Sequence, residues 1–314
     1  MNVPYNKSHS GSDLVQKWMG SYFGTKPEDC ENIGYTTKAT EGSTDIYITT
    51  FGNNGFFIEY EIKTLKRFFL SPHNIIIVDT NQDLHPEISE TLKSICEREG
   101  IIYLKAPYNH YQEQQHFDST MKLGTTLNFL HHNCVKQRQP TYFGFLDHDC
   151  FLFRPTTTDD LFIRKIKNTE PFAYNEYTTK RLDMYGTVSQ NLPKWNLHVI
   201  ANFFRYERFK DVPLDFRASY KHGLDTGGAN RDIIPYVDNE IEDYRLSHIV
   251  IRYTNEDVGR LNSVQHYEVI DSRWMHMCAS THDLLAEDIG GERKMLYTKG
   301  FLDAILRVSE IKGK

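Results

Sequence analysis

Apolar residues in the first half of the chain alternate between short continuous runs and helical spacings. Three runs are typical of strands: residues 45–54, which end in a Gly/Asn loop, 74–79 and 101–104. Three segments have apolar residues every three or four positions and are predicted helices: residues 55–69, 86–99 and 113–133. A further aromatic-rich strand ends at Asp147. This alternation predicts an α/β fold with a mostly parallel central sheet flanked by helices.

The second half of the chain, from residue 154, has a less regular pattern. Its predicted elements are strands over 198–206 and 263–270, a Gly-rich turn at 223–230 and a C-terminal helix over 294–311. No Pro-, Gly- or Ser-rich linker divides the chain. We therefore expect one domain over 1–314, in which residues 1–44 form an N-terminal extension before the first strand of the sheet.

Two aspartates, Asp147 and Asp149, stand at the end of the fourth predicted strand. Side chains on an extended chain alternate between faces, so these two should point the same way and His148 into the fold. Two carboxylates that project together repel each other unless a cation lies between them, and a hard divalent ion prefers such oxygen ligands. The structural alternative is that both carboxylates cap turns.

Composition and charge narrow the class of protein. The net charge of −6 and the absence of a Lys/Arg run argue against nucleic acid as a partner. The 5 cysteines include no Cys-x-x-Cys pair, which indicates reduced thiols. The first twelve residues lack an apolar signal core, and no apolar stretch has membrane-spanning length. We expect a cytoplasmic protein.

An apolar stripe lies in the N-terminal extension, on a predicted short helix: Leu14, Val15, Trp18, Met19 and Tyr22. Such a stripe packs on its own domain or, as the alternative, makes peripheral contact with a membrane surface or a partner. The lack of clustered Lys and Arg argues against the membrane.

Four places in the chain together resemble the glycosyltransferases of the A-type fold, a Rossmann-like class that uses nucleotide-sugar donors. They are the first strand and loop at 48–53, the second strand ending at Asp79, the Asp147–Asp149 motif, and His276 after an aromatic residue. The resemblance covers residues 45–155 well and the remainder loosely. It implies a nucleotide-sugar-binding half at 45–153 and an acceptor half at 154–314.

The resemblance also implies roles for individual residues. Asp149 would bind a divalent cation, Mn²⁺ or Mg²⁺, directly, Asp147 would contact ribose or a metal-bound water, and His276 would complete the ion's site. The nucleobase and ribose would be held by residues at strand ends: Thr49, Thr50, Phe51, Asn53 and Asp79. Asp79 has an alternative role as the cap of the following turn, and the others as parts of a plain strand-to-helix loop.

Asp225 lies in the Gly-rich turn of the predicted acceptor half. The glycines around it permit close backbone approach, so its carboxylate is held at a tight turn. It is a candidate catalytic base for an acceptor hydroxyl, or else a helix cap.

The sequence thus predicts a metal-dependent glycosyltransferase. It would move a sugar from a nucleotide-diphosphate donor, UDP-linked in preference to GDP-linked, to a hydroxyl of a saccharide or glycoconjugate acceptor. One alternative is a sugar-phosphate nucleotidyltransferase, although the loop after the first strand carries no Arg or Lys to hold a triphosphate. The other is a non-catalytic nucleotide- or glycan-binding protein with the same fold.

Overall fold

The structure is a computed structural model. It describes residues 25–51, 55–81, 85–107, 119–162, 176–180, 184–191, 194–219, 224–233, 249–252, 266–277, 299–300 and 302–307. The predicted N-terminal helix, Asn53 and Cys278 lie outside these ranges.

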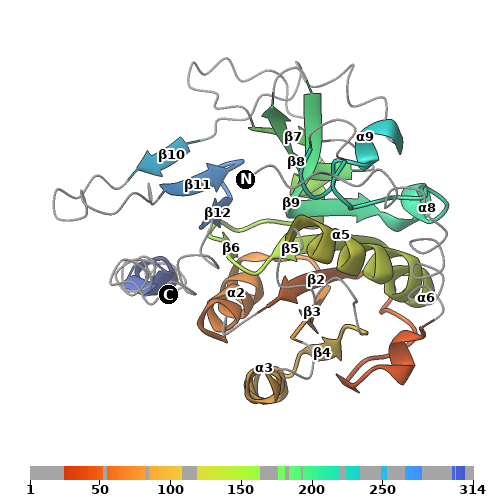
Figure 1. Cartoon of the computed structure of the whole chain (residues 1–314). Coiled ribbons are helices and arrows are strands. Elements are labelled where there is room, and N and C mark those ends of the chain that lie inside the picture. Colours follow the sequence, from red (N-terminus) through yellow and green to blue (C-terminus); the bar gives the residue numbers. More distant parts are fainter. Residues whose placement is uncertain are drawn as a thin grey trace.

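A mixed sheet of eight strands forms the centre of the described chain (Figure 1). Its order is β1-β4-β3-β2-β5-β9-β8-β7. The strands are β1 (Asn32–Ile33), β2 (Thr44–Thr50), β3 (His73–Asp79), β4 (Ile102–Lys105), β5 (Tyr142–Asp147), β7 (Glu176–Lys180), β8 (Met184–Asn191) and β9 (Lys194–Arg205). The four strands β4, β3, β2 and β5 are parallel, as predicted. The remaining pairings are antiparallel, so the parallel prediction holds for the centre of the sheet and not for its two flanks.

Helices cover both faces of the parallel strands. Ile46 and Ile48 pack in one apolar cluster with α2 (Gly55–Phe68) and α3 (Pro86–Glu99). Tyr47, between them on the strand, packs in the other cluster with α5 (Ser119–Phe129). This division follows from the alternation of side chains along β2, and it explains why all seven residues of the strand are buried.

The predicted helix over 113–133 continues further than expected. After α5 the chain forms a π-helical segment (Leu130–Val135) and then α6 (Lys136–Arg138). The other short helical elements are η2 (Pro27–Asp29), α7 (Thr158–Phe162), α8 (Tyr206–Phe209) and α9 (Asn230–Ile233). The predicted C-terminal helix is present over 299–307, apart from residue 301, which is not described.

A second, antiparallel sheet contains β10 (Ile249–Arg252), β11 (His266–Ile270), β12 (Trp274–His276) and β6 (Cys150–Leu152), in that order. Because β6 follows β5 closely in the chain, this sheet lies beside the end of the parallel strands (Figure 1). It therefore brings residues near 276 next to residues near 149, although the two are far apart in sequence.

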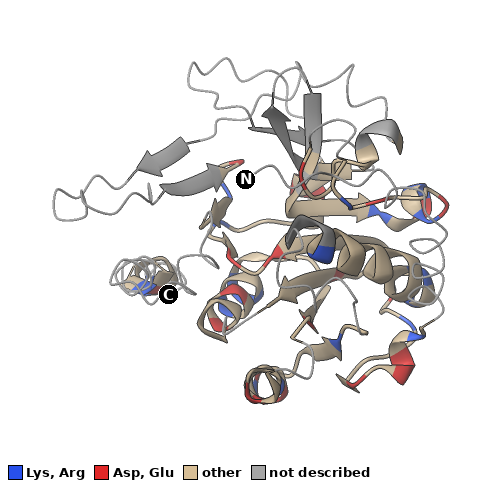
Figure 2. Ribbon diagram, in the orientation of Figure 1, with Lys and Arg blue, Asp and Glu red and all other residues tan. Residues whose placement is uncertain are grey.

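Charged residues of both signs are interspersed along α2 and α3 (Figure 2). Ion pairs join the two helices: Lys66 Nζ lies 2.9 Å from Glu99 Oε2, and Arg98 Nη2 lies 2.8 Å from Glu59 Oε1. Within the described residues, no helix is both long enough and apolar enough to cross a membrane. That the chain forms one domain stays a prediction.

Candidate metal centre

The carboxyl ends of three neighbouring parallel strands meet at one edge of the large sheet. Thr50 of β2 is paired with Asp79 of β3, and Thr49 of β2 is paired with Asp147 of β5. This is the edge at which parallel α/β sheets bind their ligands. The predicted position of these residues at strand ends is therefore confirmed.

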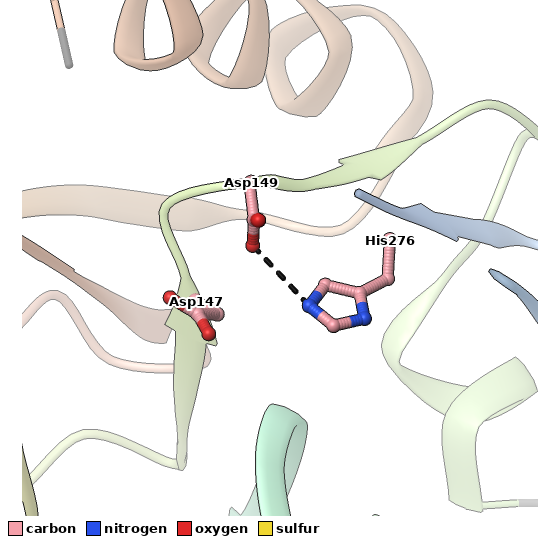
Figure 3. Close-up of side chains that lie close together, drawn as sticks. All are labelled: Asp147, Asp149 and His276. Atoms are coloured by element: carbon pink, nitrogen blue, oxygen red, sulfur yellow. Dashed lines mark ion pairs between the residues drawn. The ribbon is translucent and has the colours of Figure 1, made fainter. Parts of the chain in front are cut away.

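Asp147, Asp149 and His276 form a compact group at this edge (Figure 3). One ligand atom from each residue lies within 4.8 Å of the others. His276 Nε2 is 3.3 Å from Asp149 Oδ1. The three residues thus lie together, as the resemblance implied, and their donor atoms are close enough to hold one metal ion.

Strand pairing explains how His276 reaches this group. In the register between β12 and β6, His276 is the partner of Cys150. Just beyond that pair, the backbone N–H of Met277 donates a 3.0 Å hydrogen bond to the carbonyl of Asp149. The second sheet therefore fixes the backbone at Asp149 and at His276 in relation to each other.

The two aspartates converge for a different reason from the one that the sequence suggested. Residues 147–149 do not form one extended strand: β5 ends at Asp147, a turn occupies 148–149, and β6 begins at Cys150. The expectation based on strand alternation was wrong about the backbone, because the chain reverses here to enter the second sheet. The turn nevertheless brings both carboxylates to one place.

His148 is buried, as predicted, and its ring faces Asp147. Its Nδ1 lies 3.1 Å from Asp147 Oδ1, and its backbone N–H donates to the same oxygen over 3.0 Å. Burial by itself lowers the pKa of His148, but the hydrogen bond to Asp147 and the charges of both aspartates raise it above its usual value. Its contact with Asp147 holds that carboxylate in place.

The exposure of the three residues differs in a way that suits a ligand site. Asp149 and His276 are buried, whereas the side chain of Asp147 is 24% exposed. Two carboxylates and a neutral imidazole make an oxygen-rich donor set, which suits Mg²⁺ or Mn²⁺ better than a soft metal. The group could therefore hold such an ion from inside the fold and leave one side open to an incoming ligand.

The other residues predicted to contact a nucleotide differ in their surroundings. Thr49 and Thr50 are buried, and Phe51 just beyond them is 41% exposed. Asp79 is fully buried: its Oδ1 accepts hydrogen bonds from the backbone N–H and side-chain amide of Asn81 at 2.7 and 2.8 Å. The hydroxyl of Tyr103 donates to Asp79 Oδ2 over 2.7 Å. These contacts favour the turn-capping alternative for Asp79.

Asp225 is exposed, and its carboxylate accepts hydrogen bonds from its neighbour. The backbone N–H of Thr226 lies 2.6 Å from Asp225 Oδ1, and the Thr226 hydroxyl lies 3.3 Å from the same oxygen. The carboxylate therefore stabilises the turn at 226–229, ahead of α9, which starts only at Asn230. Its role as a catalytic base stays a prediction.

Glu61 is a residue near this group to which the sequence analysis did not point. It lies on α2, is fully buried, and makes no hydrogen bond through its carboxylate to any described residue. Burial and the negative charges of Asp147 and Asp149 raise the pKa of Glu61 well above its usual range. Its position inside the apolar stripe of Phe57, Ile58, Ile62 and Leu65 is the sequence signal that could have revealed it.

Comparisons with known proteins add little to this geometry. No protein-family model matches the sequence, and no curated protein matches it significantly. Among solved structures, a cytidylyltransferase from Leptospira borgpetersenii serovar Hardjo-bovis (strain JB197) matches with a TM-score of 0.32 and 11% sequence identity. The match covers 85% of this chain and 96% of that chain. A likeness at this level assigns neither a family nor an activity.

Proposed function

We propose that this protein is a metal-dependent glycosyltransferase that transfers a sugar from a nucleotide-diphosphate donor, most readily a UDP-linked one, to a hydroxyl of a glycan acceptor. One observation carries the proposal. Asp147, Asp149 and His276 converge at the carboxyl ends of parallel strands, where α/β sheets bind nucleotides.

The proposed role of each residue in the group follows from how deeply it is buried. The buried Asp149 and His276 would hold the divalent cation from inside the fold, and the partly exposed Asp147 would face the ligand. The bound cation would supply charge neutralisation for the departing diphosphate. Thr49 and Thr50 end the adjacent strand β2, and Phe51 follows them. In this proposal these three residues contact the nucleoside.

The first experiment tests the metal centre by nucleotide binding. UDP and GDP are titrated calorimetrically into the wild type and Asp149→Asn, with and without Mn²⁺. We expect wild-type binding to require Mn²⁺, and Asp149→Asn to lose about 2–4 kcal/mol of binding free energy, because a charged ligand contact is removed. Asp159→Asn, an exposed aspartate on α7, is the matched control and should bind like the wild type. Equal affinity in all conditions would refute the metal assignment.

The second experiment separates the proposal from its alternatives by product. A glycosyltransferase with Mn²⁺ and a nucleotide-sugar panel should release UDP or GDP, by transfer or slow hydrolysis. A sugar-phosphate nucleotidyltransferase would instead need pyrophosphate and release a nucleoside triphosphate. Tight, metal-dependent nucleotide binding with neither product would indicate a non-catalytic binding protein.

A further inference from the structure

Glu61 occupies a core-facing position of α2, where a helix usually carries an apolar residue. Its neighbours on the buried side of α2 are Phe57, Ile58, Ile62 and Leu65. Glu61 itself is 0% exposed, and neither of its carboxylate oxygens has a hydrogen-bond partner among the described residues. A buried carboxyl group without a partner destabilises a fold, and an apolar side chain of similar size would pack there without that cost.

The helix turns Glu61 toward the metal centre. Phe57 lies one turn earlier, and residues four apart share a helix face. The ring centroid of Phe57 is 6.3 Å from that of His148 and 6.2 Å from that of Phe151, on either side of Asp149. The face of α2 that carries Phe57 and Glu61 therefore packs against the turn that holds the two aspartates.

The charges that reach Glu61 from the candidate metal centre are negative. Asp147 and Asp149 lie close enough for their negative charge to act on Glu61, and Glu61 in turn acts on the buried Cys150. Three carboxyl groups thus lie near the turn at 148–149. A divalent ion bound there would neutralise part of their negative charge. Glu61 is not one of the residues whose ligand atoms lie within 4.8 Å of one another, so it belongs outside the direct ligands.

We propose that Glu61 is an outer carboxylate of the metal centre, which accepts hydrogen bonds from the hydration water of the bound cation and adds its charge to that of the aspartates. Mg²⁺ and similar ions keep several water molecules when protein-bound, and carboxylates behind the direct ligands strengthen such sites. This inference rests on the proposed metal-dependent function and extends it to a residue on α2.

The test measures Mn²⁺ itself, without nucleotide or turnover. Mn²⁺ affinity is determined by calorimetry and by the electron paramagnetic resonance signal of free Mn²⁺, for the wild type, Glu61→Gln, Glu61→Met and Asp149→Asn. The matched control is Glu59→Gln, which removes a partly exposed glutamate on the same helix, paired with Arg98. We expect both Glu61 variants to bind Mn²⁺ about 10- to 100-fold more weakly. Glu59→Gln should stay within about twofold of the wild type, because a partly exposed charge contributes little.

Thermal unfolding without metal gives a second readout that a purely structural glutamate would not produce. Glu61→Met should melt at a higher temperature than the wild type, because it removes an unsatisfied buried carboxyl. Stabilisation of the metal-free protein together with weaker Mn²⁺ binding supports the proposal. Wild-type Mn²⁺ affinity in both Glu61 variants, with Asp149→Asn impaired, would overturn the role of Glu61 alone. If the wild type does not bind Mn²⁺, both the metal centre and the role of Glu61 are wrong.

Discussion

The buried ion pair between Arg138 and Asp45 should dominate the stability of the edge of the sheet opposite the candidate metal centre. Arg138 Nε lies 2.6 Å from Asp45 Oδ2, and Nη2 lies 3.2 Å from Oδ1. The same guanidinium donates to the carbonyl and hydroxyl oxygens of Thr36 at 2.5 and 2.8 Å. The exposed fractions of the two charged side chains are 1% and 0%. One arginine thus ties the end of α6 to the start of β2.

Replacing Arg138 with Met should cost about 3–5 kcal/mol of unfolding free energy, because it leaves a buried carboxylate without its counter-charge. The side-chain amide of Asn74, 2.7 Å from Asp45 Oδ1, remains and offsets only part of this loss. Replacing both partners, as Asp45→Leu with Arg138→Met, removes the uncompensated charge. The double variant should therefore lose less than about 2 kcal/mol, which reflects the hydrogen bonds of Thr36 and Asn74.

Urea denaturation of the wild type, both single variants and the double variant forms a double-mutant cycle that measures the coupling directly. Mn²⁺ affinity of the folded Arg138→Met protein should equal that of the wild type, because the pair lies at the other end of β2 from Thr50. An unfolding free energy for Arg138→Met within about 1 kcal/mol of the wild type would refute this account of the pair.

Three further predictions concern single residues. Gly124→Ala should lower stability by about 1–3 kcal/mol in thermal or urea unfolding, because its new Cβ would lie 2.4 Å from the carbonyl oxygen of Phe216. If Asp225 is the catalytic base, Asp225→Asn should reduce turnover at least about a hundredfold and spare donor affinity, whereas near-wild-type turnover would leave it as a turn residue. Burial acts to raise the pKa of Asp215, but Arg217 and Asn128 lower it below its usual value. Its stabilising effect is therefore complete above the unfolded pKa of about 3.9 and is lost as the pH falls through the lower folded value. The difference in unfolding free energy between wild type and Asp215→Asn should be constant near pH 6 and shrink below about pH 4.

The parallel half of the large sheet could be predicted because its strands are buried on both faces. Such strands need continuous apolar runs, and residues 74–79 show one clearly. The antiparallel strands β7 and β8 were not predicted, since their sequences are largely polar and carry no comparable run. Their place in the sheet depends on pairing with β9, which local periodicity does not encode.

In the candidate site, too, some features follow from the local sequence and others depend on pairing between distant segments. Asp147, Asp149 and His276 could be proposed from residue type, position at strand ends and resemblance. The turn at 148–149 could not, because it is imposed by the pairing of β6 with a strand far away in sequence. The apolar stripe around Glu61 hints that this residue is buried, but a single acid in an amphipathic helix is usually exposed, so its burial becomes clear only from the packing of α2.

Because β12 pairs with β6, a cation bound by the proposed group would also hold the second sheet to the end of β5. Ligands from the end of β5 and from β12 would be joined through the ion, so any local opening that detaches β12 would have to release it. A ligand stabilises only against those openings that destroy its site. Mn²⁺ should therefore slow amide hydrogen exchange in β12 and its neighbour β11, and leave β1 and β4 at the far edge unchanged. In this protein, retention of the ion and closure of the second sheet would be a single equilibrium.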